Sequence, residues 1–153
     1  MTIRIIKSPT ADSRTCDVAQ VTEDQLKQSS LDHIRDVGKA IAFFNAELTQ
    51  RAAEHDYDKL TEIAWFYECF RTKFYDTSWW DNHRKIHRHH LGQVDGVPSD
   101  VNLIDVLEMV ADCVMAGMAR SGEVYDIELD NELLQRALTN TVELLKSQIV
   151  VAE

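Results

Sequence analysis

The sequence lacks the features that mark a secreted or membrane-embedded protein. Its three cysteines, Cys16, Cys69 and Cys113, are an odd number without CxxC or zinc-finger spacing. The start of the chain has no apolar stretch of the signal-peptide type. The longest apolar-rich segment, residues 101–119, contains three carboxylates, each costly in lipid. We therefore expect a cytoplasmic protein with no membrane span, and we place Cys69 and Cys113 in its core.

An excess of positive charge is also missing. The chain has 16 Lys and Arg against 26 Asp and Glu, which gives a formal net charge of −10. Non-specific binding to nucleic acid depends on a field of basic side chains that neutralises phosphates. We expect no such partner, although the basic patch in residues 84–88 could still hold a small anion.

Repeats, low-complexity tracts and interdomain linkers are absent as well. A chain of 153 residues, 44% of them hydrophobic, fits one folded domain. Residues 1–21 are expected to form an N-terminal arm, with a short strand at its three isoleucines. Residues 22–153 are expected to form a single helical domain.

Apolar residues recur at helical spacing through most of this domain. The expected helices cover residues 23–28, 30–48, 58–75, 81–91, 100–120 and 130–150. Thr22 and Gln25 have the spacing of a capping box, Ser30 and either Ser99 or Asp100 could cap later helices, and Gly92 is a natural helix stop. The sequence thus predicts an all-α single-domain bundle of five to six helices.

The helix at 100–120 carries an unusual acidic stripe. Asp105, Glu108 and Asp112 share one face, and no Lys or Arg lies within residues 101–119. A solvent-exposed helix face usually mixes charges of both signs. A partly buried stripe of this kind needs a cation to balance it, whereas the alternative is that the stripe simply faces water.

A second group of polar residues precedes this helix. His55 and Asp56 are adjacent, and His33 lies on the helix before them. Imidazole and carboxylate are ligands that suit Mn²⁺, Fe²⁺, Co²⁺, Ni²⁺ or Zn²⁺. The alternative is that Asp56 or Asp58 caps a helix beside an exposed histidine and that His33 has a structural role.

The segment DNHRKIHRHHL holds four of the six histidines. If it is helical, His83, His87 and His90 share one face, and His89 points elsewhere. These side chains could meet a metal or phosphate. Alternatively, they form a solvated helix end that offsets the helix dipole, or they neutralise the acidic stripe without any metal.

The order of these residues resembles a known family. A histidine, a His-Asp pair and a later aspartate occur in this order in the HD-domain metal-dependent phosphohydrolases, which are all-α proteins. The chain also resembles a family of uncharacterised phage and bacterial proteins, through the segments SSLDHIRDVGKA, EHDYDKL, HRHHL and DVNLIDVLEMVADCVMAGMARSG. The likeness covers most of the chain beyond the arm. It implies a cation held by His33, His55, Asp56 and either Asp105 or Asp112.

The resemblance implies a hydrolase of a small phosphorylated molecule, most naturally a nucleotide. Glu108 would orient or deprotonate a water. His87 and His90 would contact the phosphate or a second metal, and Arg84 or Arg88 would stabilise charge on the phosphate.

Two other functions fit the sequence. Glu108 and Asp112 have the ExxxD spacing of an all-α nucleoside-triphosphate pyrophosphohydrolase that uses Mg²⁺, but no upstream ExxE pair is present. A phage-encoded protein that binds a host factor in the host cytoplasm would also suit the acidic surface. The apolar helices could additionally support a homodimer.

Overall fold

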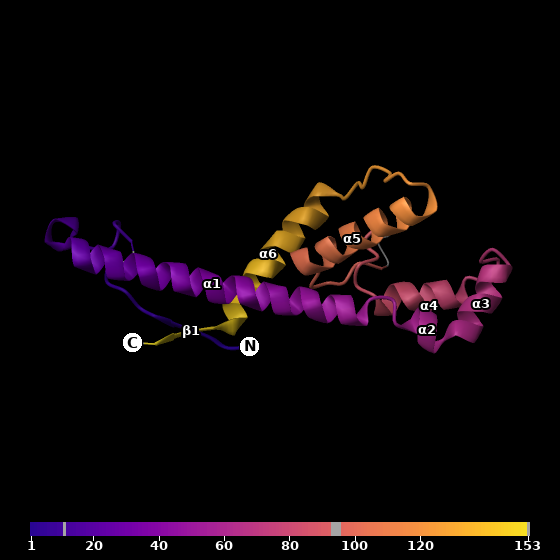
Figure 1. Cartoon of the computed structure of the whole chain (residues 1–153), viewed down its shortest axis with the longest axis horizontal. Coiled ribbons are helices and arrows are strands. Elements are labelled where there is room, and N and C mark those ends of the chain that lie inside the picture. Colours follow the sequence, from indigo (N-terminus) through magenta and orange to yellow (C-terminus); the bar gives the residue numbers. More distant parts are fainter. Residues whose placement is uncertain (11, 93–95, 153) are drawn as a thin grey trace. The chain divides into compact units, whose positions relative to one another are not determined.

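The structure is a computed structural model that describes residues 1–10, 12–92 and 96–152. The helices are α1 (Glu23–Glu54), α2 (Asp58–Thr61), α3 (Ile63–Arg71), α4 (Ser78–Ile86), α5 (Leu103–Arg120) and α6 (Asn131–Gln148), with a 3-10 turn at Val18–Gln20 (Figure 1). Two short strands, β1 (Ile3–Ile6) and β2 (Ile149–Ala152), complete the described elements. The predicted all-α class is confirmed.

The chain forms two compact units. Unit 1 comprises Met1–Ala46 and Val142–Glu153, and unit 2 comprises Glu47–Thr141. The expected division into an arm of residues 1–21 and a domain of residues 22–153 stays a prediction. Within the described residues, no helix has the length and apolar character needed to cross a bilayer.

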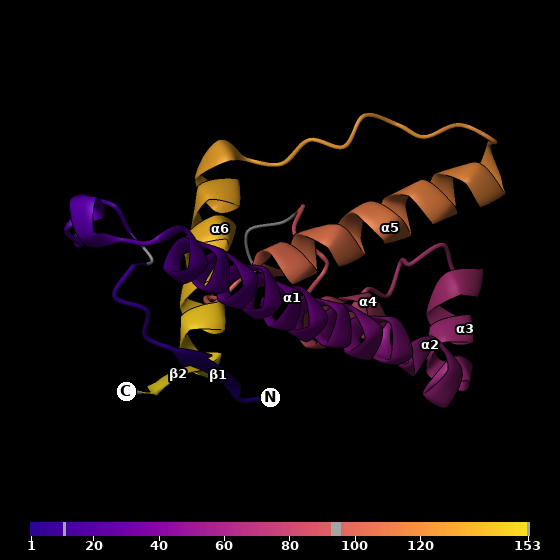
Figure 2. The same cartoon turned by 60° about the vertical axis from the view of Figure 1, so that its left-hand side comes forward.

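The sheet of unit 1 joins segments from opposite ends of the chain. β1 and β2 are parallel, and the register runs from Ile3 opposite Ile149 to Ile6 opposite Ala152; Figure 2 shows the strands side by side. The expected strand at the isoleucines is confirmed, but the expected continuation of the last helix to residue 150 is wrong. The run Ile-Val-Val is β-branched, which favours a strand once a partner is available.

Helix α1 is one continuous helix, so the expected break near residue 29 is wrong. Ser30 does not cap a new helix; its hydroxyl donates to the carbonyl of Leu26 at 2.8 Å from within α1. The capping box that starts α1 is confirmed. The backbone N–H of Gln25 donates to Thr22 Oγ1 at 3.2 Å, and the backbone N–H of Thr22 donates to Gln25 Oε1 at 3.0 Å.

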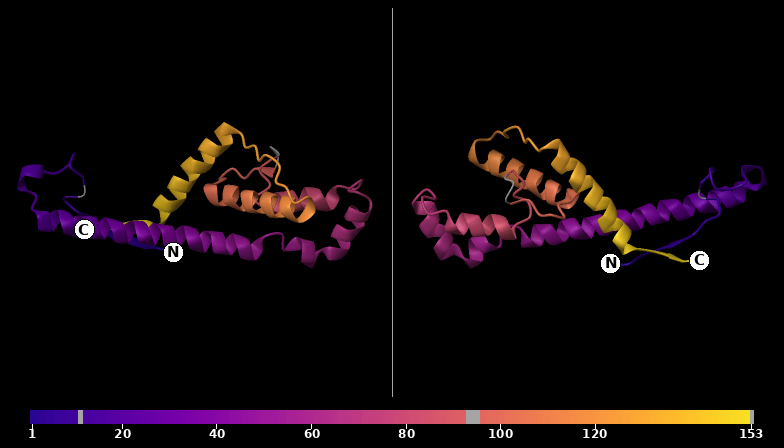
Figure 3. Two further views of the ribbon diagram at one scale, coloured as in Figure 1. Left: turned by 45° about the horizontal axis from the view of Figure 1, so that its top comes forward. Right: turned by 180° about the vertical axis from the view of Figure 1, so that it is seen from behind.

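The helix expected over 58–75 is divided in unit 2. Glu62 leaves helical geometry with φ −114° and ψ 29°, which separates α2 from α3. After α3 the chain reverses through Phe74, whose φ is 59°. The turn brings aromatic rings together, since Phe66 lies 6.3 Å from Phe74 and 4.3 Å from Trp79 between ring centroids. Helices α3 and α4 therefore pack against each other (Figure 3).

Helix α4 ends at Ile86, so the expected helix as far as residue 91 is wrong. His87 has extended geometry, with φ −99° and ψ 118°. His83, His87 and His90 therefore do not share one helical face, contrary to the prediction. Gly92 therefore does not end this helix, and the expected stop there is wrong. The turn-rich link after it lies partly outside the described residues.

The core of unit 2 lies where α5 meets the first part of α6. Its buried members are Leu91, Val101, Met109 and Ala137. Cys69 is buried as expected, but Cys113 is exposed, so its assignment to the core is wrong. Residues in the middle of an apolar helix can still face outward, because the face that is buried depends on neighbouring elements.

The start of α5 is held by Asn102 and not by Ser99 or Asp100. The Asn102 side chain accepts from the amide of Ile104 at 2.9 Å, and Asp105 accepts from the Asn102 amide at 2.9 Å. This reciprocal capping box uses Asp105 as its acidic member. The capping box therefore fixes where α5 begins and with it the position of the acidic stripe in unit 2.

Candidate metal centre

The His55-Asp56 pair lies in the turn between α1 and α2. Asp56 adopts φ 51°, a left-handed conformation that Asp tolerates better than most residues. Lys59 contacts Asp56 Oδ2 from one turn further on. The turn therefore fixes the direction of the carboxylate, and its other oxygen, Oδ1, remains available.

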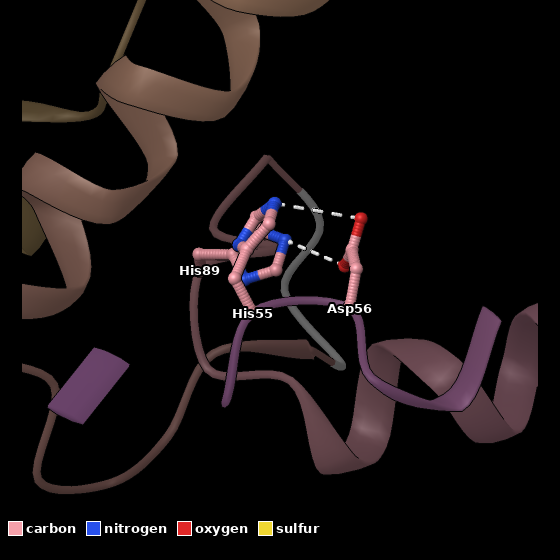
Figure 4. A group of neighbouring side chains, drawn as sticks. All are labelled: His55, Asp56 and His89. Atoms are coloured by element: carbon pink, nitrogen blue, oxygen red, sulfur yellow. Dashed lines mark ion pairs between the residues drawn. The ribbon is translucent and has the colours of Figure 1, made fainter. Parts of the chain in front are cut away.

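Three imidazoles point their Nε2 atoms at Asp56. The Nε2 of His55 lies 3.5 Å from Oδ2, and the Nε2 atoms of His83 and His89 lie 3.4 Å and 3.5 Å from Oδ1. Figure 4 shows the rings of His55 and His89 facing this carboxylate. Asp56 Oδ1 and the Nε2 atoms of His83 and His89 are all buried without a hydrogen-bond partner among the described residues. Burying polar atoms without hydrogen-bond partners destabilises the folded state unless a ligand or ion binds between them.

Carboxylates behind the imidazoles determine which nitrogen carries the proton. His83 Nδ1 lies 2.8 Å from Asp58 Oδ2, and the Nδ1 atoms of His55 and His89 each lie 3.0 Å from Glu108 Oε1. The Nδ1–H groups of His83 and His55 donate to these carboxylates, which leaves their Nε2 lone pairs free. The Nδ1 of His89 lies near Glu108 Oε1 but is buried without a hydrogen-bond partner among the described residues. This carboxylate–histidine arrangement is typical of metal ligands in proteins.

A second group of ligand atoms shares Asp56. The atoms of His55, Asp56 and His89 lie within 4.8 Å of one another, and so do those of Asp56, His83 and His87. In the second group His87 donates from Nε2 to buried Asp58 at 2.8 Å. The described residues thus contain a buried His/Asp cluster that could hold a metal ion.

Burial affects the charge of these groups. It lowers the pKa of His83 in spite of the nearby Asp58, and it is the main cause that lowers the pKa of His90 to about 3. For Asp56, burial acts to raise the pKa, but Lys59 and the imidazoles hold it below its usual value. Neutral imidazoles and ionised carboxylates are the forms that bind divalent cations.

The acidic stripe of α5 is balanced from outside the helix, as predicted. Asp105 is fully buried and accepts two hydrogen bonds of 2.8 Å from Arg88, while Arg51 lies 3.5 Å away. Glu108 contacts the two imidazoles described above. The alternative that the stripe faces water is therefore wrong for Asp105 and Glu108. Asp112 lies at the rim, 3.7 Å from His55 Nε2 and 3.9 Å from His89 Nε2.

The predicted cationic residues have acidic partners. Arg88 bonds Asp105 and also Asp100 at 2.9 Å, so its guanidinium is engaged by protein carboxylates. Arg84 donates to Asp81 at 2.7 Å. Spacing alone could not show whether these arginines bind protein carboxylates or a phosphate, because an i to i+4 pair of arginines can bind either group.

His33 belongs to unit 1, where it is exposed and lines a pocket that also includes Asp32 and Asp36. Neither metal-ligating group found among the described residues includes it. His90 lies within the histidine cluster, with its ring 4.2 Å from that of His89.

The sequence did not indicate the role of Asp58 and led to a wrong prediction of the direction of His89. Asp58 looked like a helix-capping residue, yet it is 1% exposed and bonds two imidazoles. His89 was expected to point away from the other histidines, but α4 ends three residues earlier and His89 turns inward. The density of histidines and acids was the only sequence feature that could have indicated either role.

Known proteins offer no relative of this chain. No family model matches the chain, and neither the curated proteins nor the solved structures give a significant match. The geometry of unit 2 is therefore the basis for any functional assignment.

Proposed function

We propose that the protein is a metal-dependent hydrolase of a small phosphorylated molecule, with its cation at His55, Asp56 and His89. One observation carries the proposal. Asp56 Oδ1 and the Nε2 of His89 lie 3.5 Å apart and are both buried without a hydrogen-bond partner among the described residues, and the Nε2 of His55 lies 3.5 Å from the other oxygen of Asp56. A cation among these atoms would satisfy both buried ones. The Nε2 of His83 lies 3.4 Å from the same Asp56 oxygen, and His83 belongs to the second group.

The donor set favours a transition metal. Imidazole nitrogen with carboxylate oxygen suits Mn²⁺, Fe²⁺, Co²⁺, Ni²⁺ and Zn²⁺, whereas Mg²⁺ prefers a shell of oxygen ligands. When bound, such a cation lowers the pKa of a coordinated water and polarises a phosphoryl oxygen. The second group, with His83 and His87, adjoins the first through Asp56.

The side chains around the cluster have distinct roles in this proposal. Glu108 Oε1 accepts from the Nδ1 of His55 and lies 3.0 Å from the Nδ1 of His89, which makes Glu108 a positioning residue. Asp112 has a side chain that is 30% exposed, and its carboxylate can accept a proton from an attacking water. Lys59 pairs with Asp56 Oδ2 and helps to hold the pKa of this carboxyl below its usual value.

The main rival is an internal network of histidines and acids that holds no metal. Elemental analysis of protein purified without chelator separates the two, and phosphate release from p-nitrophenyl phosphate and nucleotides with each cation then tests catalysis. Asp56→Asn should reduce metal occupancy and abolish phosphate release, because Asn keeps the left-handed turn but loses the charge. Asp36→Asn in unit 1, where Asp36 pairs with Lys39, is the matched control.

The proposal fails on either of two results. The first is wild-type protein that neither carries nor takes up any of these cations, as judged by elemental analysis and by the absence of a chelator effect on its melting temperature. The second is an Asp56→Asn variant that retains metal occupancy and activity.

A further inference from the structure

A cavity of about 580 Å³ adjoins the cluster within unit 2. Its lining includes His89, which is one of the proposed ligands, together with His90 and Asp112. Its size falls within the usual range of small-molecule sites, which is roughly 300 to 1,000 Å³. The cavity is therefore placed to hold the part of a substrate that extends from the reacting group.

The walls of this cavity combine apolar and acidic groups. Leu91, Met109 and Ile127 supply apolar surface, and Tyr125 exposes its ring. The segment after α5 runs close to the helix at Gly117, where an added Cβ would lie 2.7 Å from the Glu123 carbonyl oxygen. Such a surface suits a flat organic body.

The charges lining the cavity limit what it can accept. Asp112, Asp126 and Glu128 are acidic, and Arg120 is the single Lys or Arg among the described lining residues. Carboxylates accept hydrogen bonds from hydroxyl and amino groups, but they repel additional phosphates. The charge of the cation would balance one phosphate, whereas a second phosphate would face these carboxylates without a comparable positive partner.

We propose that this cavity binds the organic part of a singly phosphorylated, nucleoside-sized substrate, and that its carboxylates select against a second phosphate. The inference rests on the proposed function, since the cation position defines where the single phosphate lies. Because Asp126 and Glu128 are exposed, their effect is screened by salt, so the selectivity should narrow as the ionic strength rises.

Cys113 provides a readout that does not depend on turnover. It is exposed and lines the cavity, whereas Cys16 lies in unit 1 and serves as an internal control. Alkylation with iodoacetamide would be followed at each cysteine by peptide mapping, under mildly alkaline conditions, because burial and Asp112 raise the pKa of the Cys113 thiol. The probes are AMP and ADP, with UMP and UDP as a second pair, on metal-loaded protein without excess cation.

We expect the monophosphates to slow alkylation of Cys113 at concentrations about threefold to tenfold lower than the diphosphates, while Cys16 is unaffected. In the variant Asp126→Asn/Glu128→Gln the two classes should protect equally, with metal content unchanged. Equal or better protection by diphosphates in the wild type, or no protection by any probe on metal-loaded protein, overturns the inference.

Failure of the proposed function looks different. Absence of bound cation, or absence of phosphate release from every ester, removes the hydrolase. Selective protection of Cys113 by monophosphates without phosphate release would keep the cavity assignment and remove only the catalysis.

Discussion

Substitution of Glu108 by Gln is the most informative change in the cluster. Oε1 of Glu108 lies 3.0 Å from Nδ1 of both His55 and His89, and the side chain is 10% exposed. Gln keeps the length of the side chain and one acceptor oxygen, but it removes the charge that makes both imidazoles better ligands. The variant should therefore fold and bind metal weakly.

The size of the effect follows from the shared contact. Loss of one carboxylate behind a metal-ligating histidine weakens metal binding by about 10- to 100-fold. Glu108 bonds His55 and also places its charge 3.0 Å from His89 Nδ1, so we expect the upper end of this range, about 100-fold. At a metal concentration 100 times the wild-type Kd, stabilisation by the cation should fall from about 2.7 to about 0.4 kcal/mol. For a chain of this length the metal-induced rise in melting temperature should shrink by about 5–9 °C.

Two assays measure this change. Trp79 stacks on His83 with ring centroids 4.6 Å apart, so its fluorescence should report titration with Co²⁺ or Ni²⁺. Scanning calorimetry with and without metal supplies the second value. Glu132→Gln, on the exposed surface of α6, is the control and should match the wild type. Wild-type affinity in Glu108→Gln would refute the positioning role, and lost turnover at unchanged affinity would make Glu108 the proton acceptor.

Three further predictions concern the metal-free protein. Asp58→Ala should lower the free energy of unfolding in urea by about 3 kcal/mol, because it leaves two buried imidazoles without their acceptor; a loss below about 1 kcal/mol would contradict this. Acidification from pH 6.5 towards pH 3 should destabilise the protein, because His90 binds a proton in the unfolded chain but not in the folded state, where its pKa is about 3. This contribution is absent above pH 6.5. His90→Gln should therefore make the free energy of unfolding in urea depend less steeply on pH. Asn102→Ala should cost about 1–2 kcal/mol in the same assay through loss of the α5 capping box, and an unchanged midpoint would show that the cap contributes nothing.

The errors in the sequence-based helix assignments share one cause. The end of α4 was expected too late because Gly92 is a natural stop, and the end of α6 because apolar spacing continued past it. The expected break in α1 followed from a Ser that caps nothing. Helix periodicity is a local property, whereas the residue at which a helix ends depends on partners elsewhere in the chain. At α4 that partner is Asp58, which bonds His87 just past the helix end.

The sequence by itself determined the helical class, the capping box at Thr22, the His55-Asp56 pair and the acidic stripe of α5, because each depends on residues within a few positions of one another. Only the tertiary structure decided that Asp105 binds Arg88, and that Glu108 and Asp58 orient imidazoles towards Asp56. Those contacts join residues 17 to 53 positions apart. Spacing along one helix cannot specify them, since they depend on how separate elements pack and on which ring nitrogen each carboxylate reaches.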